Sequence, residues 1–252
     1  MKANQLRKEI RKHALAFAKR RNLPIDDSYA SALIFSNLDD CFHPESLSNI
    51  RKTPEWEKRT QKAHQNVPEV LEMQSSNSSD ALLMNVFCHP SIKKWKGIKQ
   101  VFGNELESIK FGVPGAVRKN GHQDSTEIDM VLSGVFCEAK LTEDDFTQKS
   151  SEVVEDYDEL KSTFHDEALP RVGTDYDNYQ IIRNLLAAKQ HDCSHILICD
   201  GRRPDLIRRY FTVVSCLRKI EWRKRCQVVL WQEIVAACGV DLREWVEEKY
   251  GF

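Results

Sequence analysis

The spacing of hydrophobic residues divides the chain into two parts with different patterns. In the first part, residues 1–74, four apolar residues recur at helical spacing: Leu6, Ile10, Ala14 and Phe17. The stretch 22–35 predicts a turn and a second helix, with Asp26, Asp27 or Ser28 as its cap. The stretch 53–73 predicts one or two further short helices. We therefore expect residues 1–74 to form a helical N-terminal extension.

The second part, residues 75–252, alternates helices with strands. Strands are expected where apolar and polar residues alternate, or where short apolar runs are bounded by turns, at 106–117, 125–132, 135–141, 195–200 and 226–231. Helices are expected at 80–88, 92–103, 145–164, 176–190, 204–217, 232–238 and 241–250, with Ser79 or Asp80 capping the first. This order predicts an α/β or α+β domain with one mixed central sheet flanked by helices.

Composition adds limits to this picture. The chain has 252 residues, of which 41% are hydrophobic, and a net charge of -1, which suits one fairly large domain or a domain with a small appendage. No apolar run is long enough to cross a membrane, and the basic N-terminus lacks the apolar stretch of a signal peptide. We expect a cytoplasmic protein with no membrane partner. None of the eight cysteines forms a C-x-x-C pair, which favours reduced core thiols over a metal–thiolate site.

The two strands at 125–132 and 135–141 carry the candidate chemistry. Because side chains alternate along a strand, Glu138 and Lys140 share one face. A tight Ser-Gly turn makes the strands antiparallel neighbours, so Asp129 is expected opposite Glu138. Two neighbouring carboxylates repel each other unless a proton or a cation lies between them. Mg²⁺ or Mn²⁺ would suit such oxygen ligands, with the carbonyl of Ala139 as a third.

This arrangement suits metal-dependent phosphodiester hydrolysis. A bound metal activates water and neutralises charge in the transition state, and Lys140 would orient the water or stabilise the same charge. The simpler alternative is a solvated hairpin with a Glu–Lys pair and an unrelated aspartate, and the spacing by itself does not exclude it.

The same two segments resemble the core motif of the PD-(D/E)XK nuclease superfamily, which has the restriction-endonuclease-like fold. Asp129, Glu138 and Lys140 match its aspartate, acidic residue and lysine, while Ile128 replaces the motif's proline. Segments such as "SSDALLMNVF", "EAKLTEDDF" and "HILICDGRRPD" are also similar to a set of bacterial restriction endonucleases. The resemblance covers residues 75–252 and adds nothing for the first 74.

The resemblance implies a Mg²⁺-dependent nuclease that hydrolyses DNA, in restriction or defence. A repair nuclease, or an inactive nuclease-fold module for DNA binding or assembly, is the alternative. Some relatives carry a glutamine and a tyrosine near the metal site on a helix after the motif, and Tyr179, Gln180 and Arg183 look similar. Gln180 is thus a candidate catalytic residue, and Tyr179 and Arg183 are candidate DNA contacts. A homodimer is plausible because cutting both strands requires two sites.

Several assignments stay open from the sequence. Arg183, Arg202 and Arg203 are candidates for contact with DNA phosphates, but a structural salt bridge or a solvated helix end explains them equally well. Glu143 could bind a second metal or begin the next helix. Superfamily members often add an acidic residue from the preceding helix, and three residues compete for that place: Asp80, Glu105 and Glu107. The recognition sequence and strand preference are not predicted.

Overall fold

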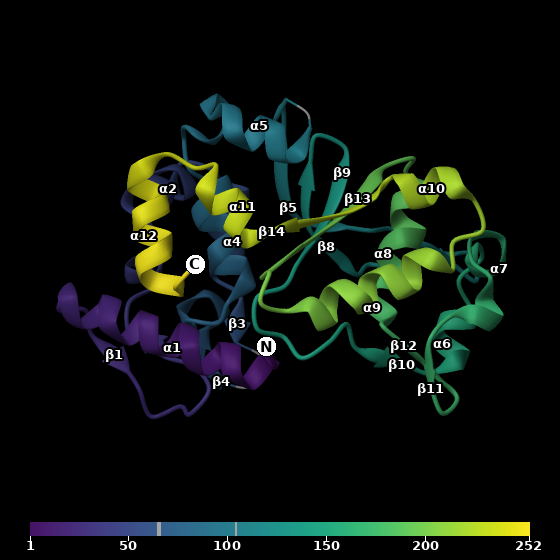
Figure 1. Cartoon of the computed structure of the whole chain (residues 1–252), viewed down its shortest axis with the longest axis horizontal. Helices are drawn as coiled ribbons and strands as arrows, with labels where there is room; N and C mark the ends of the chain where they lie inside the picture. The colour runs from purple at the N-terminus through teal and green to yellow at the C-terminus, as the bar shows by residue number, and fades with distance from the viewer. Residues whose placement is uncertain (65–66, 104) are drawn as a thin grey trace.

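The centre of the molecule is a five-stranded mixed β-sheet (Figure 1). The computed structural model describes residues 1–64, 67–103 and 105–252. The strands lie in the order β14-β13-β9-β8-β5, with the bounds β5 (Ile109–Pro114), β8 (Glu127–Leu132), β9 (Val135–Ala139), β13 (Ser194–Cys199) and β14 (Cys226–Leu230). β5, β8 and β9 form an antiparallel meander, whereas β13 runs parallel to both β9 and β14. The predicted mixed sheet is confirmed.

The turn between β8 and β9 sets the register of the hairpin. Ser133 and Gly134 both have a positive φ, of 49° and 83°, which a two-residue turn of this twist requires at both positions. The resulting register pairs Met130 with Cys137 and Leu132 with Val135. The pattern of residues at 125–141 therefore predicted this hairpin correctly.

Alternate side chains of the sheet enter two different hydrophobic cores. Met130, Cys137 and Ile196 belong to the first core, and Phe136 and Leu197 belong to the second. The helices that contribute to the first core include α1 (Ala3–Arg20), α4 (Ser79–Phe87), α5 (Lys96–Phe102), α11 (Trp231–Ala236) and α12 (Val240–Tyr250). The second core includes α8 (Tyr179–Gln190) and α9 (Pro204–Ser215). In Figure 1 the sheet accordingly lies between α1, α4 and α12 on one side and α8 and α9 on the other.

The N-terminal part shares the first core with the rest of the chain. α1 packs along α12 (Figure 1), where Phe17 meets Trp245 edge to face and Arg20 forms an ion pair with Glu248. The expected boundary at 74–75 therefore does not separate two hydrophobic cores.

Two helices predicted in the first part are wrong. Residues 22–35 form the paired strands β1 (Ile25–Asp26) and β2 (Ile34–Phe35) around a loop. Asp26 does accept a hydrogen bond from the Ser28 amide, but in a local turn and not at a helix start. The end of the segment 53–73 forms the antiparallel strands β3 (Ala63–His64) and β4 (Val67–Leu71) in place of a further helix, and residues 65–66 lie outside the described part.

The long polar helix expected at 145–164 is also wrong. Thr147 has a φ of 60°, and its amide donates to the Asp145 carboxylate, so the backbone turns where a helix would begin. The segment instead contains β10 (Gln148–Lys149), α6 (Ser151–Glu155) and α7 (Leu160–Thr163). β10 joins β11 (Arg171–Val172) and β12 (Asp175–Asp177) in a separate small sheet.

The remaining elements are short. They are α2 (Pro44–Arg51), α3 (Pro54–Thr60), β6 (Arg118–Lys119), β7 (His122–Gln123) and α10 (Ile220–Lys224), with 3-10 turns at Leu38–Cys41, Glu72–Gln74, Ile92–Lys94 and Asp166–Ala168. α10 was not predicted from the sequence. Within the described residues, no helix combines the length and the apolar character needed to span a membrane.

Candidate active site

The ends of β8 and β9 bring three predicted residues to one cleft. Continuing the register of the hairpin places Asp129 opposite Glu138, and the Ala139 amide donates to Asp129 Oδ2 at 2.9 Å. Lys140 directly follows β9. All four residues line an open cleft with a volume of about 650 Å³. The sequence predicted this juxtaposition, and the cleft leaves room for an ion and part of a substrate.

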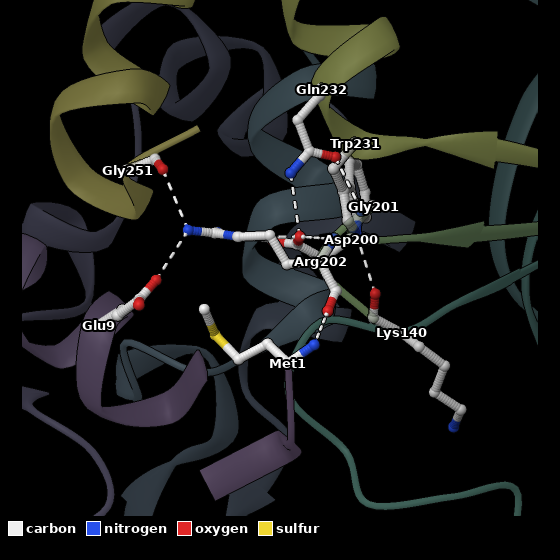
Figure 2. Close-up of polar contacts among 9 residues, drawn as sticks. All are labelled: Met1, Glu9, Lys140, Asp200, Gly201, Arg202, Trp231, Gln232 and Gly251. Atoms are coloured by element: carbon white, nitrogen blue, oxygen red, sulfur yellow. Dashed lines mark hydrogen bonds and ion pairs between the residues drawn. The ribbon is translucent and has the colours of Figure 1, made fainter. Parts of the chain in front are cut away.

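Lys140 is fixed at both its side chain and its backbone. Its Nζ lies 2.9 Å from Glu138 Oε1 and 3.0 Å from Gln180 Oε1. The Lys140 amide donates to the Ile198 carbonyl on β13, and the Lys140 carbonyl accepts a hydrogen bond from the Trp231 indole at 3.0 Å (Figure 2). The chain therefore leaves this ammonium little freedom to change its position.

The second oxygen of Glu138 is held by a residue that sequence reasoning missed. Asn184 Nδ2 donates to Glu138 Oε2 at 2.7 Å, and Arg183 Nη2 donates to Asn184 Oδ1 at 2.7 Å. Asn184 follows Gln180 by four residues on α8, so both side chains lie on the same face of the helix. That spacing was the available signal for Asn184.

Burial and charge set the protonation of the three residues in different directions. Burial, together with the negative charges of Glu138 and Asp80, raises the pKa of Asp129 well above its usual value. Burial alone would raise the pKa of Glu138 as well, but the positive charges of Lys140 and Arg183 outweigh it, and the pKa is lowered. Burial alone would lower the pKa of Lys140, but the carboxylates around it raise that pKa. Lys140 and Glu138 therefore form an ion pair, and Asp129 is the carboxylate that favours a proton or a cation.

The oxygen donors fit a hard divalent cation such as Mg²⁺ or Mn²⁺. Asp129 and Glu138 offer carboxylate oxygens, and the backbone of Ala139 lines the same cleft. The described part of the chain contains no group of three or more His, Cys, Asp or Glu side chains arranged to hold a metal. Any cation here would therefore rely on these two carboxylates, with carbonyl or water oxygens completing its shell.

A third acid, Asp80, enters the cleft from the start of α4. The N-cap of α4 is Ser78, whose hydroxyl accepts from the Ala81 amide at 3.0 Å, so the expected caps Ser79 and Asp80 lie inside the helix. Both side chains line the cleft, and Asp80 is bound by Arg59 from α3. Of the three acids that competed for this place, Asp80 is the one in the cleft lining, and Glu105 and Glu107 are not part of it.

Glu143 shapes the loop after β9. Its two carboxylate oxygens accept from the Ser79 hydroxyl at 2.7 Å and from the Leu141 amide at 2.6 Å. The alternative in which Glu143 begins the next helix is wrong, because the chain turns first and α6 begins only at Ser151. Glu143 lines the cleft, and its role toward a metal stays a prediction.

The three arginines expected on DNA have partners within the chain. Arg183 is buried and donates to Asn184 and to the Glu127 carbonyl. Arg203 is fully buried and donates to the carbonyls of residues 143 and 144. Arg202 lies between Asp200, Glu9 and the Gly251 carbonyl (Figure 2). The structure therefore favours structural roles for these three residues, since direct contact with phosphate would require them to leave these partners.

Other basic residues surround the cleft. Arg7 and Lys62 line the cleft itself, and Lys58 and Lys62 line an adjoining hollow of about 300 Å³. Tyr179, the remaining predicted DNA contact, lines a separate hollow of about 500 Å³ together with Lys149, and its hydroxyl lies 2.7 Å from that of Tyr157. The sequence had not singled out these lysines.

Comparison with known proteins gives one match. A family described as "Restriction Endonuclease associating with ARP" matches residues 11–251. The match therefore includes most of the segment that the sequence resemblance had left out. No curated protein and no solved structure matches the chain.

Proposed function

The chain belongs to this restriction endonuclease family, and from that premise we propose that it is a nuclease that hydrolyses DNA phosphodiester bonds with a divalent metal, in restriction or defence. The observation that carries the proposal is the meeting of Asp129, Glu138 and Lys140 in one open cleft. The raised pKa of Asp129 adds support, because a buried carboxylate beside other carboxylates is expected to have a raised pKa when no cation is bound to it.

Each group in the cleft has a defined task in this proposal. Asp129 and Glu138, with the Ala139 carbonyl, would hold Mg²⁺ or Mn²⁺, which supplies Lewis acidity and lowers the pKa of water. Lys140 stays protonated, so it can orient the attacking water or stabilise negative charge on the phosphate, and it does not act as a general base.

Two residues of α8 keep these groups in place. Gln180 accepts from the Lys140 ammonium, and Asn184 donates to the Glu138 carboxylate. Both therefore act by positioning their partners. Reactions of this kind depend strongly on such positioning, because small displacements of a reacting group lower the rate.

The surroundings of the cleft suit a polyanionic substrate. Arg7 and Lys62 lie in the cleft, and the two hollows are lined by Lys58, Arg59, Lys62, Lys119 and Lys149. Among the described residues, Lys58 and Lys149 have no ion-pair partner, so they are free to contact a substrate. These lysines could thus neutralise phosphates of a bound DNA strand. The choice of DNA rests on the family, since restriction endonucleases act on DNA.

A cleavage assay tests this function. Supercoiled plasmid and linear duplex DNA are incubated with the protein and Mg²⁺ or Mn²⁺, and the wild type is compared with Lys140→Ala and Asp129→Asn. We expect metal-dependent cleavage that falls by about 10²–10³ in rate in either variant. If a folded wild type cuts no nucleic acid with either metal and behaves as Lys140→Ala does, the chain is a DNA-binding or assembly module of nuclease fold.

A further inference from the structure

Arg59 reaches the cleft from α3, in the part of the chain expected to lie outside the nuclease domain. Its Nη2 lies 2.9 Å from Asp80 Oδ1 and 2.8 Å from Asp80 Oδ2, and its Nη1 lies 3.4 Å from Glu127 Oε2. The side chains of Arg59 and Asp80 are only 9% and 7% exposed. The guanidinium thus contacts both oxygens of the third acid in the cleft.

The neighbouring strand leaves space for this guanidinium. Gly112 on β5 has a φ of +58°, and an added Cβ there would lie 2.1 Å from Arg59 Nη1. A residue with a side chain would therefore collide with the guanidinium and adopt a strained backbone. Among the described residues, the buried Nε of Arg59 has no hydrogen-bond partner, so the carboxylates hold the group in place without satisfying all its donors.

The charges around the cleft give this contact its importance. Seven of the residues that line the cleft are acidic and three are basic. The ion pairs Arg59–Asp80 and Lys140–Glu138 occupy two of the carboxylates, and among the described residues Asp129 forms no ion pair. The negative charge of Asp80 contributes to the raised pKa of Asp129, and Arg59 lies close enough to Asp129 to interact with it. Arginine keeps its charge at any ordinary pH, so the Asp80 carboxylate stays bound to Arg59 and is not available to other cations while this ion pair lasts.

We propose that Arg59 withholds Asp80 from the metal, so that the site takes a single divalent ion through Asp129 and Glu138. The proposal rests on the function proposed above and adds a residue that sets the metal stoichiometry of that site. Loss of the guanidinium frees two carboxylate oxygens at the edge of the cleft. Asp80 then joins the metal ligands, and the site binds a divalent ion more tightly or binds a second one.

The test is a titration of the metal-free protein with Mn²⁺, in which binding is measured by calorimetry and by the paramagnetic resonance signal of free Mn²⁺. In Arg59→Met we expect the dissociation constant for Mn²⁺ to fall about tenfold or more, or a second equivalent to bind. Arg59→Gln keeps a polar partner for Asp80 without the charge, and it is used alongside in case the methionine variant does not fold. We expect the same direction of change in both variants.

Two controls separate ligation from a general effect of charge. The double variant Arg59→Met/Asp80→Asn has the same net charge as the wild type but cannot offer Asp80, and its affinity for Mn²⁺ should stay within about threefold of the wild type. Lys58→Met removes one positive charge from the hollow that Arg59 also lines and releases no ion-paired carboxylate of the described residues, so it should tighten binding by less than about threefold.

The outcomes decide between the two proposals. If the wild type binds Mn²⁺ in a manner that Asp129→Asn abolishes, but Arg59→Met and Arg59→Gln bind it as the wild type does, the role of Arg59 is overturned and the proposed metal site stands. Equal tightening in Lys58→Met, or a tenfold loss of affinity in the double variant, also overturns it. If the wild type binds no Mn²⁺ at Asp129, the proposed function itself fails.

Discussion

Replacing Asp129 by asparagine should stabilise the metal-free protein, although it should lower the cleavage rate by about 10²–10³. The substitution removes a buried negative charge that Glu138 and Asp80 repel, while the asparagine oxygen can still accept the hydrogen bond from the Ala139 amide. The attraction between Asp129 and Lys140 is lost and offsets part of the gain. We expect a net increase in the free energy of unfolding on the order of 1–2 kcal/mol, because near neutral pH the wild type must bury a charge that folding disfavours.

The sign of the pH dependence follows from the direction of the pKa shift. Because folding raises the pKa of Asp129, the wild type loses stability relative to the variant as pH rises from the unfolded value near 4 through the raised folded value. The advantage of Asp129→Asn should therefore be greatest near pH 8 and shrink toward pH 4. Burial also lowers the pKa of His195 to about 4, but its protonation destabilises both proteins alike and cancels in the comparison.

Thermal unfolding in a chelating buffer, followed by circular dichroism, measures this difference. For a chain of this size, about 1–2 kcal/mol corresponds to a rise in Tm of about 2–8 °C at pH 8. Adding Mn²⁺ should reverse the order, since an ion at 100 times its Kd stabilises the wild type by about 2.7 kcal/mol and the variant far less. A metal-free variant that melts below the wild type at pH 8 would falsify the view that Asp129 lacks a counter-charge.

Three further substitutions test the structure around the site. Asn184→Ala removes a hydrogen bond to the buried Glu138 carboxylate, and chemical denaturation should show a loss of about 1.5–3 kcal/mol, with cleavage reduced; an unchanged midpoint would contradict this contact. Arg203→Met leaves buried carbonyls at Glu143 and the next residue without donors, so we expect the same assay to show a loss of about 2–3 kcal/mol in the free energy of unfolding. A variant with unchanged stability and weaker DNA binding would contradict this role. Ser78→Ala removes the N-cap of α4 and should lower stability by about 1 kcal/mol, whereas Ser79→Ala leaves the cap in place and removes the hydrogen bond to the Glu143 carboxylate.

The hairpin could be predicted because its signals are local. Alternation along 125–141 and the Ser-Gly turn fix which residues face each other, and with them the pair Asp129 and Glu138. Lys140 follows from the same alternation. Gln180 was named from the resemblance, and Asn184 could have been added, since the two are four residues apart on α8.

Errors occurred where local polar contacts compete with helix formation. The stretch 145–164 has the composition of a polar helix, but the Asp145 carboxylate accepts from the Thr147 amide and stabilises a turn. The same happens at Asp26 and Ser28, where a residue expected to cap a helix closes a turn. Aspartate and serine favour both structures, so the tertiary context decides between them.

The fate of the arginines could not be read from the sequence, because charge patterns do not reveal burial. Arg183, Arg202 and Arg203 looked like a basic surface near the motif, yet each forms its contacts within the chain. Two of them support the site indirectly, since Arg183 orients Asn184 and Arg203 holds the carbonyl of Glu143. Their removal is therefore expected to act on stability and geometry before it acts on DNA binding.

The N-terminal part contributes to the site in a way that no local pattern announces. Arg59 lies 21 residues before Asp80 and 68 before Glu127, and only the folded chain brings the three together. Arg7 on α1 lines the same cleft and forms an ion pair with Asp144 at 2.9 Å, so a second residue of this part reaches the loop after β9. The family match begins at residue 11 and therefore includes α3 with Arg59. A truncated chain that begins at residue 75 would lack Arg59 and the α1 surface that packs on α12. Because that surface is part of the first hydrophobic core, we expect the truncated chain not to fold, and its activity would then not report on Arg59.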